Sequence, residues 1–420
     1  MIYFIKKAAL LLLAFGLILS ACGCAPGQLN LAEDDESEDG MFRRALWISQ
    51  YDMVDVYLDG GRQRELGDYT ELCQRIVENC TSLGFDTLIV QLRPNGDSIY
   101  PSELFPPSRY AVGAYGGEFE YDPFPPLLEA ARARGLEVHG WINPFRLMTA
   151  DEIELLDRQY LIKKWWDDPK TRGRTVVEHS GRLYLNPAYP EVRRLISDGA
   201  AEIMEKYALD GLHIDDYFYP HGIGADFDAE AYVEFSGGLS LADWRRENVT
   251  ETVKMLYGAV KNADPCALFG VSPGGNIDTA FNTDYADIYK WCGEAGYIDY
   301  ICPQIYFGLE HGTWDFASTY EKWEAAVTCP EVELFVGITL GKAVNGELGI
   351  ADPYAGSGGR EWIENKDIIK RCLELVRREK RATGVTFFCY QYFFDPVSGK
   401  PNPASARELE NFLPVWREME

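Results

Sequence analysis

The chain has 420 residues, and its 66 acidic side chains against 40 basic ones give a formal net charge of −26. A negative field of this size argues against nucleic acid or another polyanion as a partner, because like charges repel. A neutral polymer is easier to accommodate. Aromatic residues make up 13% of the sequence, and their flat rings suit the faces of sugars.

The first residues have the pattern of an export signal. Lys6 and Lys7 precede an apolar run over 8–19 that is too short to cross a bilayer as a helix. The sequence Leu-Ser-Ala-Cys over 19–22 resembles a bacterial lipobox, which implies cleavage before Cys22 and acylation of that residue. We therefore expect a lipoprotein signal peptide over 1–21. A lipid anchor at Cys22 would hold the protein in the cell envelope, on the extracytoplasmic side of a bacterial membrane.

Residues 22–41 are rich in Gly, Pro, Asp, Glu and Ser. Such a segment cannot bury enough apolar surface to offset the entropy that it loses on ordering, so we expect a flexible tether there. The rest, 42–420, has no second low-complexity break and is expected to form a single catalytic domain. Cys73 and Cys80 are two helical turns apart, too far for a disulfide. We expect most of the ten cysteines to be buried free thiols.

Short apolar runs alternate with amphipathic segments along this domain. Apolar strands that alternate with helices indicate a parallel sheet covered on both faces, and eight such units favour a closed (β/α)₈ TIM barrel with loop insertions. No Gly-x-Gly-x-x-Gly motif follows the first strand, so a dinucleotide has no support and we expect no cofactor. The expected strands are 45–49, 87–92, 137–142, 211–215, 268–272, 300–306, 334–339 and 385–390. The expected helices are 69–82, 124–134, 190–207, 244–262, 285–293, 319–327 and 367–381.

The active site of such a barrel lies at the carboxyl ends of its strands. Polar and aromatic residues gather at those ends of the expected strands. Side-chain amides and Arg can hydrogen-bond sugar hydroxyls, whereas Trp and Tyr rings can stack on a sugar. The residues expected to bind substrate are Arg93, Asn95, Trp141, Asn143, Arg146, His213, Tyr217, Ser272, Gln304, Tyr306 and Tyr390.

The strand over 211–215 ends in two adjacent carboxylates. Alternation of side chains places Leu212 and Ile214 against the helices and points Asp215 into the barrel mouth, which makes Asp215 the leading catalytic candidate. Asp216 lies where the strand becomes a loop and could face either way. His213 is expected to hydrogen-bond Asp215 or the substrate.

Cleavage of a glycoside normally needs two carboxyl groups, and the second one stays open. The candidates are Asp216, Asp97 after the second strand and Glu310 after the sixth, with Glu103 and Asp278 further away. With five histidines and no His-Glu-x-x-His motif, we expect no zinc site. A calcium or magnesium site at Asp215 and Asp216 is an alternative.

Several segments resemble the bacterial glycosyl hydrolase-like 10 family, which includes a divisome-localised lipoprotein that acts on denuded peptidoglycan glycan strands. The resemblance implies a barrel, export and action on a glycan. The sequence departs from the family pattern at Gly274 and Gly275, where an aromatic residue and a glycine are expected. The matching segments are 44–49, 135–146, 185–193, 210–220, 243–248, 270–275 and 298–306.

The segment Asp-Gly-Leu-His-Ile-Asp over 210–215 is also similar to the fourth-strand block of the alpha-amylase superfamily. That resemblance implies that Asp215 is a nucleophile and that His213 takes the place of an arginine. The superfamily's acid, a Glu after the fifth strand, has no counterpart here.

We expect a monomeric glycoside hydrolase that cleaves a cell-wall glycan or related polysaccharide, with Asp215 as nucleophile or base. Two alternatives remain open. One is a glycan-binding lipoprotein without catalytic activity, and the other is a metal-dependent hydrolase on the same barrel.

Overall fold

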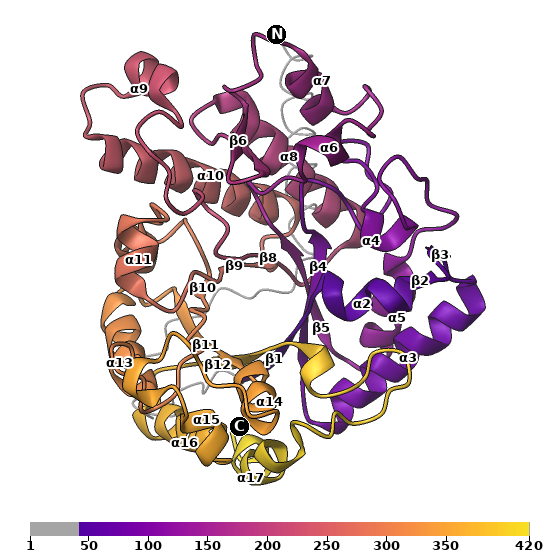
Figure 1. The fold of residues 1–420 in the computed structure, drawn as a ribbon, viewed down its shortest axis with the longest axis vertical. Coiled ribbons are helices and arrows are strands. Elements are labelled where there is room, and N and C mark those ends of the chain that lie inside the picture. Colours follow the sequence, from indigo (N-terminus) through magenta and orange to yellow (C-terminus); the bar gives the residue numbers. More distant parts are fainter. Residues whose placement is uncertain (1–41, 420) are drawn as a thin grey trace, which may run out of the picture. The chain divides into compact units, whose positions relative to one another are not determined.

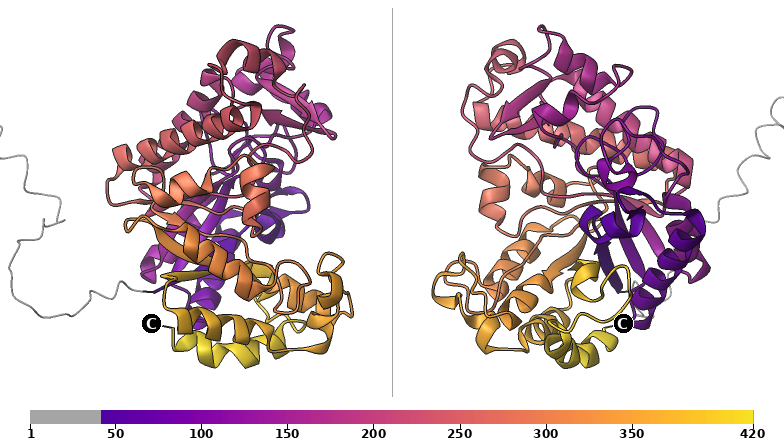
Figure 2. Two further views of the ribbon diagram at one scale, coloured as in Figure 1. Left: turned by 90° about the vertical axis from the view of Figure 1, so that its left-hand side faces the viewer. Right: turned by 45° about the vertical axis from the view of Figure 1, so that its right-hand side comes forward.

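The computed structural model describes residues 42–419, so the expected signal peptide, the lipidation site Cys22 and the tether lie outside the described residues. Eight parallel strands close into a barrel, and helices surround it (Figure 1). Figure 2 shows the same arrangement from two other sides. The expected (β/α)₈ barrel is therefore confirmed. Its strands are β1 (Arg43–Ile48), β4 (Thr87–Arg93), β5 (Glu137–Ile142), β8 (Gly211–Ile214), β9 (Leu268–Val271), β10 (Tyr300–Ile301), β11 (Glu333–Thr339) and β12 (Gly384–Phe388).

Long helices follow the strands on the outside of the barrel. In α8 (Pro190–Tyr207), a proline occupies the first turn, where its missing N–H costs nothing. Apolar residues such as Ile196 and Ile203 recur on the face that packs on the barrel, and the helix ends at Ala208, which has a left-handed φ of 46°. The other surrounding helices are α3 (Leu66–Ser82), α5 (Phe124–Ala133), α10 (Leu241–Ala263), α12 (Ile288–Gly293), α13 (Phe316–Ala326), α16 (Ile368–Glu379) and α17 (Ala406–Arg417).

Short elements decorate the loops, and the sequence patterns did not predict them. They are too short to show a clear period of their own. The helical ones are α2 (Gln50–Tyr57), α4 (Arg109–Val112), α6 (Ala150–Ile153), α7 (Leu161–Asp167), α9 (Ala229–Phe235), α11 (Ile277–Asn282), α14 (Gly341–Glu347), α15 (Glu361–Glu364), η1 (Gly356–Gly358) and η2 (Tyr390–Tyr392). Two antiparallel hairpins pair β2 (Leu58–Asp59) with β3 (Arg62–Gln63), and β6 (Val176–His179) with β7 (Arg182–Leu185).

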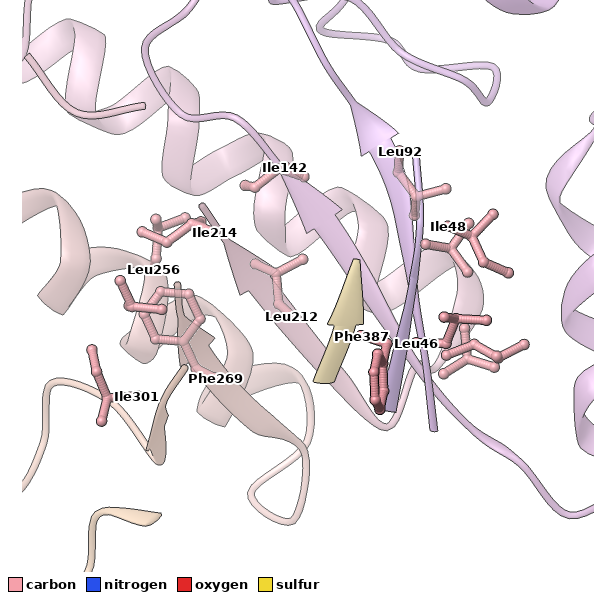
Figure 3. Packing of buried hydrophobic residues seen from close by; sticks show 14 of the residues in the cluster. Leu46, Ile48, Leu92, Ile142, Leu212, Ile214, Leu256, Phe269, Ile301 and Phe387 are labelled. Atoms are coloured by element: carbon pink, nitrogen blue, oxygen red, sulfur yellow. The ribbon is translucent and has the colours of Figure 1, made fainter. Parts of the chain in front are cut away.

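The strand phase expected at β8 is confirmed. Leu212 and Ile214 belong to the large core between strands and helices, where they pack near Leu256 of α10 (Figure 3). A smaller cluster that includes Trp47 and Tyr300 fills the barrel interior. Alternate residues of each strand thus enter different cores, as the pleat requires.

One strand is shorter than expected. The sequence predicts a strand over 300–306, but β10 pairs only at Tyr300 and Ile301. Pro303 has no N–H to donate to the sheet, which interrupts the ladder. Pairing resumes at one residue, because Gln304 bridges Gly274 on one side and Gly337 on the other.

A chain of hydrogen bonds crosses the barrel interior and fixes the tautomers of two buried histidines. The indole Nε1 of Trp47 donates to Nε2 of His213 at 3.2 Å. Because an indole N–H can only donate, this ring nitrogen carries no proton. Burial holds the pKa of His213 well below its usual range, so the ring is neutral and its proton lies on Nδ1.

The Tyr300 hydroxyl continues this chain. It accepts from Nδ1 of His213 at 2.9 Å and donates to Nδ1 of His139, also at 2.9 Å. Burial lowers the pKa of His139 to about 4, so this ring is neutral too. A Cβ on Gly270 would lie 1.9 Å from the Tyr300 ring, so glycine is the residue that leaves room for the phenol.

Seven cysteines are buried as free thiols, which confirms the expectation for them: Cys73, Cys80, Cys292, Cys302, Cys329, Cys372 and Cys389. Among the helices of residues 42–419, none combines the length and the apolar character that a bilayer crossing needs.

Replacement of Tyr300 by Phe removes the hydroxyl and leaves Nδ1 of both histidines without a partner. We expect the free energy of unfolding to fall by about 1–3 kcal/mol, the cost of unpaired buried polar groups. The midpoint of urea unfolding measures this change. The control is Tyr289→Phe, because Tyr289 is 50% exposed, and we expect it to change stability by less than about 0.5 kcal/mol. Equal stability of the two variants would contradict a role for the buried chain.

Candidate active site at the carboxyl ends of the barrel strands

A cavity of about 200 Å³ opens at the carboxyl ends of the barrel strands, and we call it the mouth cavity. Residues from β1, β4, β5 and β12, and from the segments after β1, β5, β8, β9 and β10, line it. It is lined by Trp47, Ser49, Gln50, Tyr51, Gln91, Trp141, Asn143, Arg146, Asp215, Asp216, Tyr217, Ser272, Gln304, Tyr306 and Phe388.

Many of the residues expected at the site meet in this cavity. Sequence positions that are more than one hundred residues apart come together because the strand ends converge on one face of the barrel. The expected residues that line the mouth cavity are Trp141, Asn143, Arg146, Asp215, Asp216, Tyr217, Ser272, Gln304 and Tyr306.

Asp97 and Glu310, two candidates for the second carboxyl, do not line this cavity. The carboxylate of Asp97 is fully buried and accepts from the Asn95 N–H at 2.8 Å and from the Tyr115 hydroxyl at 3.0 Å. These bonds hold a loop together. Glu310 is exposed, and its backbone N–H donates to Glu361 at 3.0 Å.

Four expected substrate-binding residues also lie elsewhere. The register between β4 and β5 shifts after Gln91, and the guanidinium of Arg93 lies 4.2 Å from the Phe105 ring centroid instead of in the cavity. The Asn95 side chain accepts from Arg182 at 3.1 Å. His213 lies in the barrel interior, where its partners are Trp47 and Tyr300 rather than Asp215. The Tyr390 hydroxyl accepts from Asn79 of α3 at 2.9 Å.

Asp215 follows β8 directly and is 3% exposed. Its Oδ1 accepts the backbone N–H of Tyr217 at 3.2 Å. Burial and the charge of Asp216 raise the pKa of Asp215 well above its usual range, while that backbone bond and the Arg146 guanidinium act in the opposite direction. A ligand that fills the cavity would therefore change how readily the Asp215 carboxyl ionises.

Asp216 is partly exposed and lines the same cavity. Burial raises its pKa, and Gln304, His221 and Arg146 oppose the shift. Two adjacent carboxyls that repel each other titrate as a pair, so they are expected to share one proton and one charge over part of the pH range. Such a pair can supply a nucleophile or a base.

Two buried donors in the cavity make no well-aligned hydrogen bond among the described residues, although the Trp141 indole lies near enough to Asp215 to lower the pKa of that carboxyl. They are Nε1 of Trp141 and Oγ of Ser272. Buried polar groups are nearly always paired in folded proteins, so these two are suited to the hydroxyls of a bound sugar. Tyr217 is 39% exposed, and the Arg146 guanidinium lies 4.3 Å from its ring centroid. The cavity therefore offers both hydrogen bonds and aromatic surface.

Sequence reasoning missed the wall formed by Trp47, Ser49, Gln50, Tyr51 and Phe388. Ser49 caps α2 together with Asp52, three residues later. This capping-box pattern is a visible signal that a helix starts directly after the first strand. It would have placed the residues around Ser49 at the barrel mouth.

A second cavity of about 330 Å³ adjoins the first, with Asp216, Gln304 and Tyr306 in the walls of both. Sequence reasoning missed its buried acid, Asp284, which lies between α11 and α12 and does not directly follow a strand in the sequence. The remaining residues that line it are His221, Gly274, Gly275, Asn276, Thr279, Asp284, Phe307, His311, Lys342, Asp352 and Tyr354.

The sequence profile of the family described as Glycosyl hydrolase-like 10 matches residues 43–355. The chain is similar to the glycosyl hydrolase YngK of Bacillus subtilis, with 31% identity over 80% of this chain, and it spans 66% of the length of that relative. It is also similar to the glycosyl hydrolase DigH of Escherichia coli K12, with 27% identity over 93% of this chain and 94% of DigH.

Solved glycosidases share the fold. The glycoside hydrolase domain of PgaB (BpsB) from Bordetella bronchiseptica aligns with a TM-score of 0.51 and 11% identity, over 88% of this chain and 99% of that domain. The catalytic domain of β-amylase from Paenibacillus polymyxa aligns with a TM-score of 0.52 and 9% identity, over 90% and 99%. This barrel is the fold of proteins that cleave or bind glycans. The profile match and the two curated relatives show that the chain belongs to the glycosyl hydrolase-like 10 family.

Proposed function

We propose that the protein hydrolyses glycosidic bonds in a bacterial cell-wall glycan, the peptidoglycan strands or a related polysaccharide, with Asp215 as nucleophile or base. The observation that carries this proposal is the position of Asp215. It is buried at the end of β8, beside a second carboxyl, in a cavity with unpaired donors. The Tyr217 N–H is the one well-aligned donor to its carboxylate among the described residues, and the Trp141 indole and Arg146 lie close by, so a bound substrate can complete its surroundings.

The chemistry follows from the position of Asp215. Hydrolysis breaks the bond between the anomeric carbon and the leaving oxygen. In a retaining reaction the ionised Asp215 carboxylate bonds to the anomeric carbon, whereas in an inverting reaction it takes a proton from the attacking water. Both routes need the ionised form, which burial and Asp216 disfavour and which the Tyr217 N–H, Arg146 and Trp141 favour.

The substrate class is supported by the names of the relatives and by the family resemblance. Both curated relatives are named glycosyl hydrolases, and the family resemblance implies peptidoglycan strands without their peptides.

The Leu-Ser-Ala-Cys motif over 19–22 supports a further proposal, that a lipid at Cys22 holds the protein at the membrane where such a glycan lies.

Asp215→Asn keeps the size of the side chain and removes its charge. On denuded peptidoglycan strands we expect kcat to fall by at least about 10³-fold, because a nucleophile or base is lost. Mass spectrometry of released oligosaccharides measures the rate. Glu310→Gln is the control, since Glu310 is exposed and outside the cavity.

The same experiment separates catalysis from binding. Retained binding of the glycan by Asp215→Asn, with loss of cleavage, supports the enzyme. A wild-type protein that binds the strands and never cleaves them would instead establish the glycan-binding alternative. Loss of wild-type activity on treatment with a chelator would favour the metal-dependent alternative.

Trp141→Phe keeps most of the aromatic surface and removes the unpaired N–H. We expect the affinity for glycan fragments to fall by about 3–10-fold, which corresponds to one hydrogen bond of roughly 0.5–1.5 kcal/mol. Isothermal titration in the Asp215→Asn background measures binding without cleavage. The control is Trp165→Phe, on α7 and outside both cavities. Equal affinities of the two variants would refute a sugar contact by the indole N–H.

Cys22→Ser removes the acylated thiol. We expect the wild type to incorporate a fatty acid label and the serine variant to incorporate none, because the thiol is the acceptor. Labelling of cells with an alkyne fatty acid, followed by capture of the protein, measures this. A wild type without label, or equal labelling of the two proteins, would contradict the anchor.

A further inference from the structure

We infer that Asp284 is the proton donor of the reaction and that the second cavity holds the sugar on the leaving-group side of the scissile bond. This rests on the proposed glycoside hydrolysis, and it supplies the acid that the strand ends lack. Asp284 is buried, its Oδ1 accepts no hydrogen bond from the described residues, and its cavity shares a wall with the mouth cavity.

Asp284 lies in the loop after β9, between α11 and α12, on the same face of the barrel as Asp215. Its backbone N–H donates to the Thr279 carbonyl at 3.1 Å, which ties the residue to α11. The residue is 4% exposed and lines the second cavity. It therefore combines burial with access to a space that a ligand can enter.

No described residue gives the Asp284 Oδ1 a hydrogen bond. Nδ1 of His221 lies 3.2 Å away, but the contact lacks the alignment of a hydrogen bond. An unpaired buried acceptor costs folding about 1–3 kcal/mol, so a purely structural role does not account for Asp284. A sugar oxygen bound in the cavity would supply the missing partner.

The charges around Asp284 favour its protonated form. Burial, followed by the negative charge of Asp216, raises the pKa of Asp284 to about 8. Lys342 does not offset this, because its Nζ lies 2.6 Å from Oδ2 of Asp352. A carboxyl that keeps its proton at neutral pH is what a general acid requires. The charged and titratable groups that share its cavity are Asp216, His221, His311, Tyr306, Lys342, Asp352 and Tyr354.

The two cavities are arranged for neighbouring sugars of one chain. Asp216 lines both, together with Gln304 and Tyr306. A Cβ on Gly274 would meet only Oδ2 of Asp216, at 4.0 Å, so this position leaves the space beside Asp216 open. Ligand sites typically measure about 300–1,000 Å³, and the mouth cavity alone, at about 200 Å³, falls below that range. Together with the second cavity it reaches the range.

Asp215, Asp284 and water supply every group that the reaction needs. As the bond between the anomeric carbon and the glycosidic oxygen breaks, its electron pair stays on the oxygen, which takes the proton of Asp284. Asp215 bonds to the anomeric carbon, or it accepts a proton from the water that does so. In the first case, a water then attacks the anomeric carbon, the bond to Asp215 breaks, and the water returns a proton to Asp284. In the second, Asp215 gives its proton to solvent and Asp284 recovers one.

Asp284→Asn in the full-length protein tests the inference on denuded peptidoglycan strands. The amide has nearly the same shape but is no acid, so we expect kcat to fall by about 10²–10⁴-fold, with KM changed by less than about threefold, as for a group that acts in the transition state. The matched control is Asp278→Asn in α11. Asp278 is exposed, its carboxylate lies 3.6 Å from the Lys322 ammonium, and it lines neither cavity.

The dependence of kcat/KM on pH distinguishes a proton donor from a residue that only supports the structure. In the wild type, kcat/KM should fall as pH rises through about 8, because Asp284 then loses the proton that it must donate. The residual activity of Asp284→Asn should lack this limb. Asp284→Glu keeps an acid and should recover part of kcat with a shifted limb, and it serves as the test if the Asn variant does not fold.

The outcomes are distinct. If Asp284→Asn retains kcat within about threefold while Asp215→Asn is inactive, the inference is wrong and the proposed hydrolysis stands. A basic limb that is unchanged in Asp284→Glu would likewise overturn it. If the wild type releases no fragments, the proposed function and this inference fall together.

Discussion

The Tyr300 hydroxyl, held between two histidines, is the interaction on which the interior of the barrel depends. It links β5, β8 and β10 through His139 and His213, and Trp47 extends the link to β1. Each bond fixes the next, because the indole can only donate and neutral imidazole has one donor and one acceptor. The result is a rigid, uncharged floor, and Trp47 belongs both to this floor and to the wall of the mouth cavity.

Burial on top of this floor controls the chemistry of the acids. Burial raises the pKa of Asp215, Asp216 and Asp284, and the charge of Asp216 raises the pKa of Asp215 and Asp284 further. Groups with raised pKa values can retain protons at neutral pH, and only part of the set can be charged at once. Glycoside hydrolysis uses carboxyl groups in different protonation states, with one charged and others protonated. The Arg146 guanidinium lowers the pKa of both Asp215 and Asp216 and so favours a negative charge on this pair.

The sequence predicted the barrel well, because apolar strands and amphipathic helices have distinct periods that burial enforces. It also predicted the direction of Asp215, from the alternation around Ile214. It failed where local geometry departs from a regular strand. The register shift after Gln91 moves Arg93 into packing with Phe105. Asp284 carries no sequence signal, because its burial depends on contacts made by the folded loop beyond α11.

The account makes a central claim about geometry: one glycan crosses both cavities, between Asp215 and Asp284. A crystal structure of the Asp215→Asn protein with a denuded peptidoglycan oligosaccharide tests it most directly. The claim predicts an anomeric carbon facing residue 215 and its glycosidic oxygen within about 2.6–3.2 Å of the Asp284 carboxyl. An oligosaccharide bound in the mouth cavity alone, with its leaving oxygen directed away from Asp284, would contradict the claim.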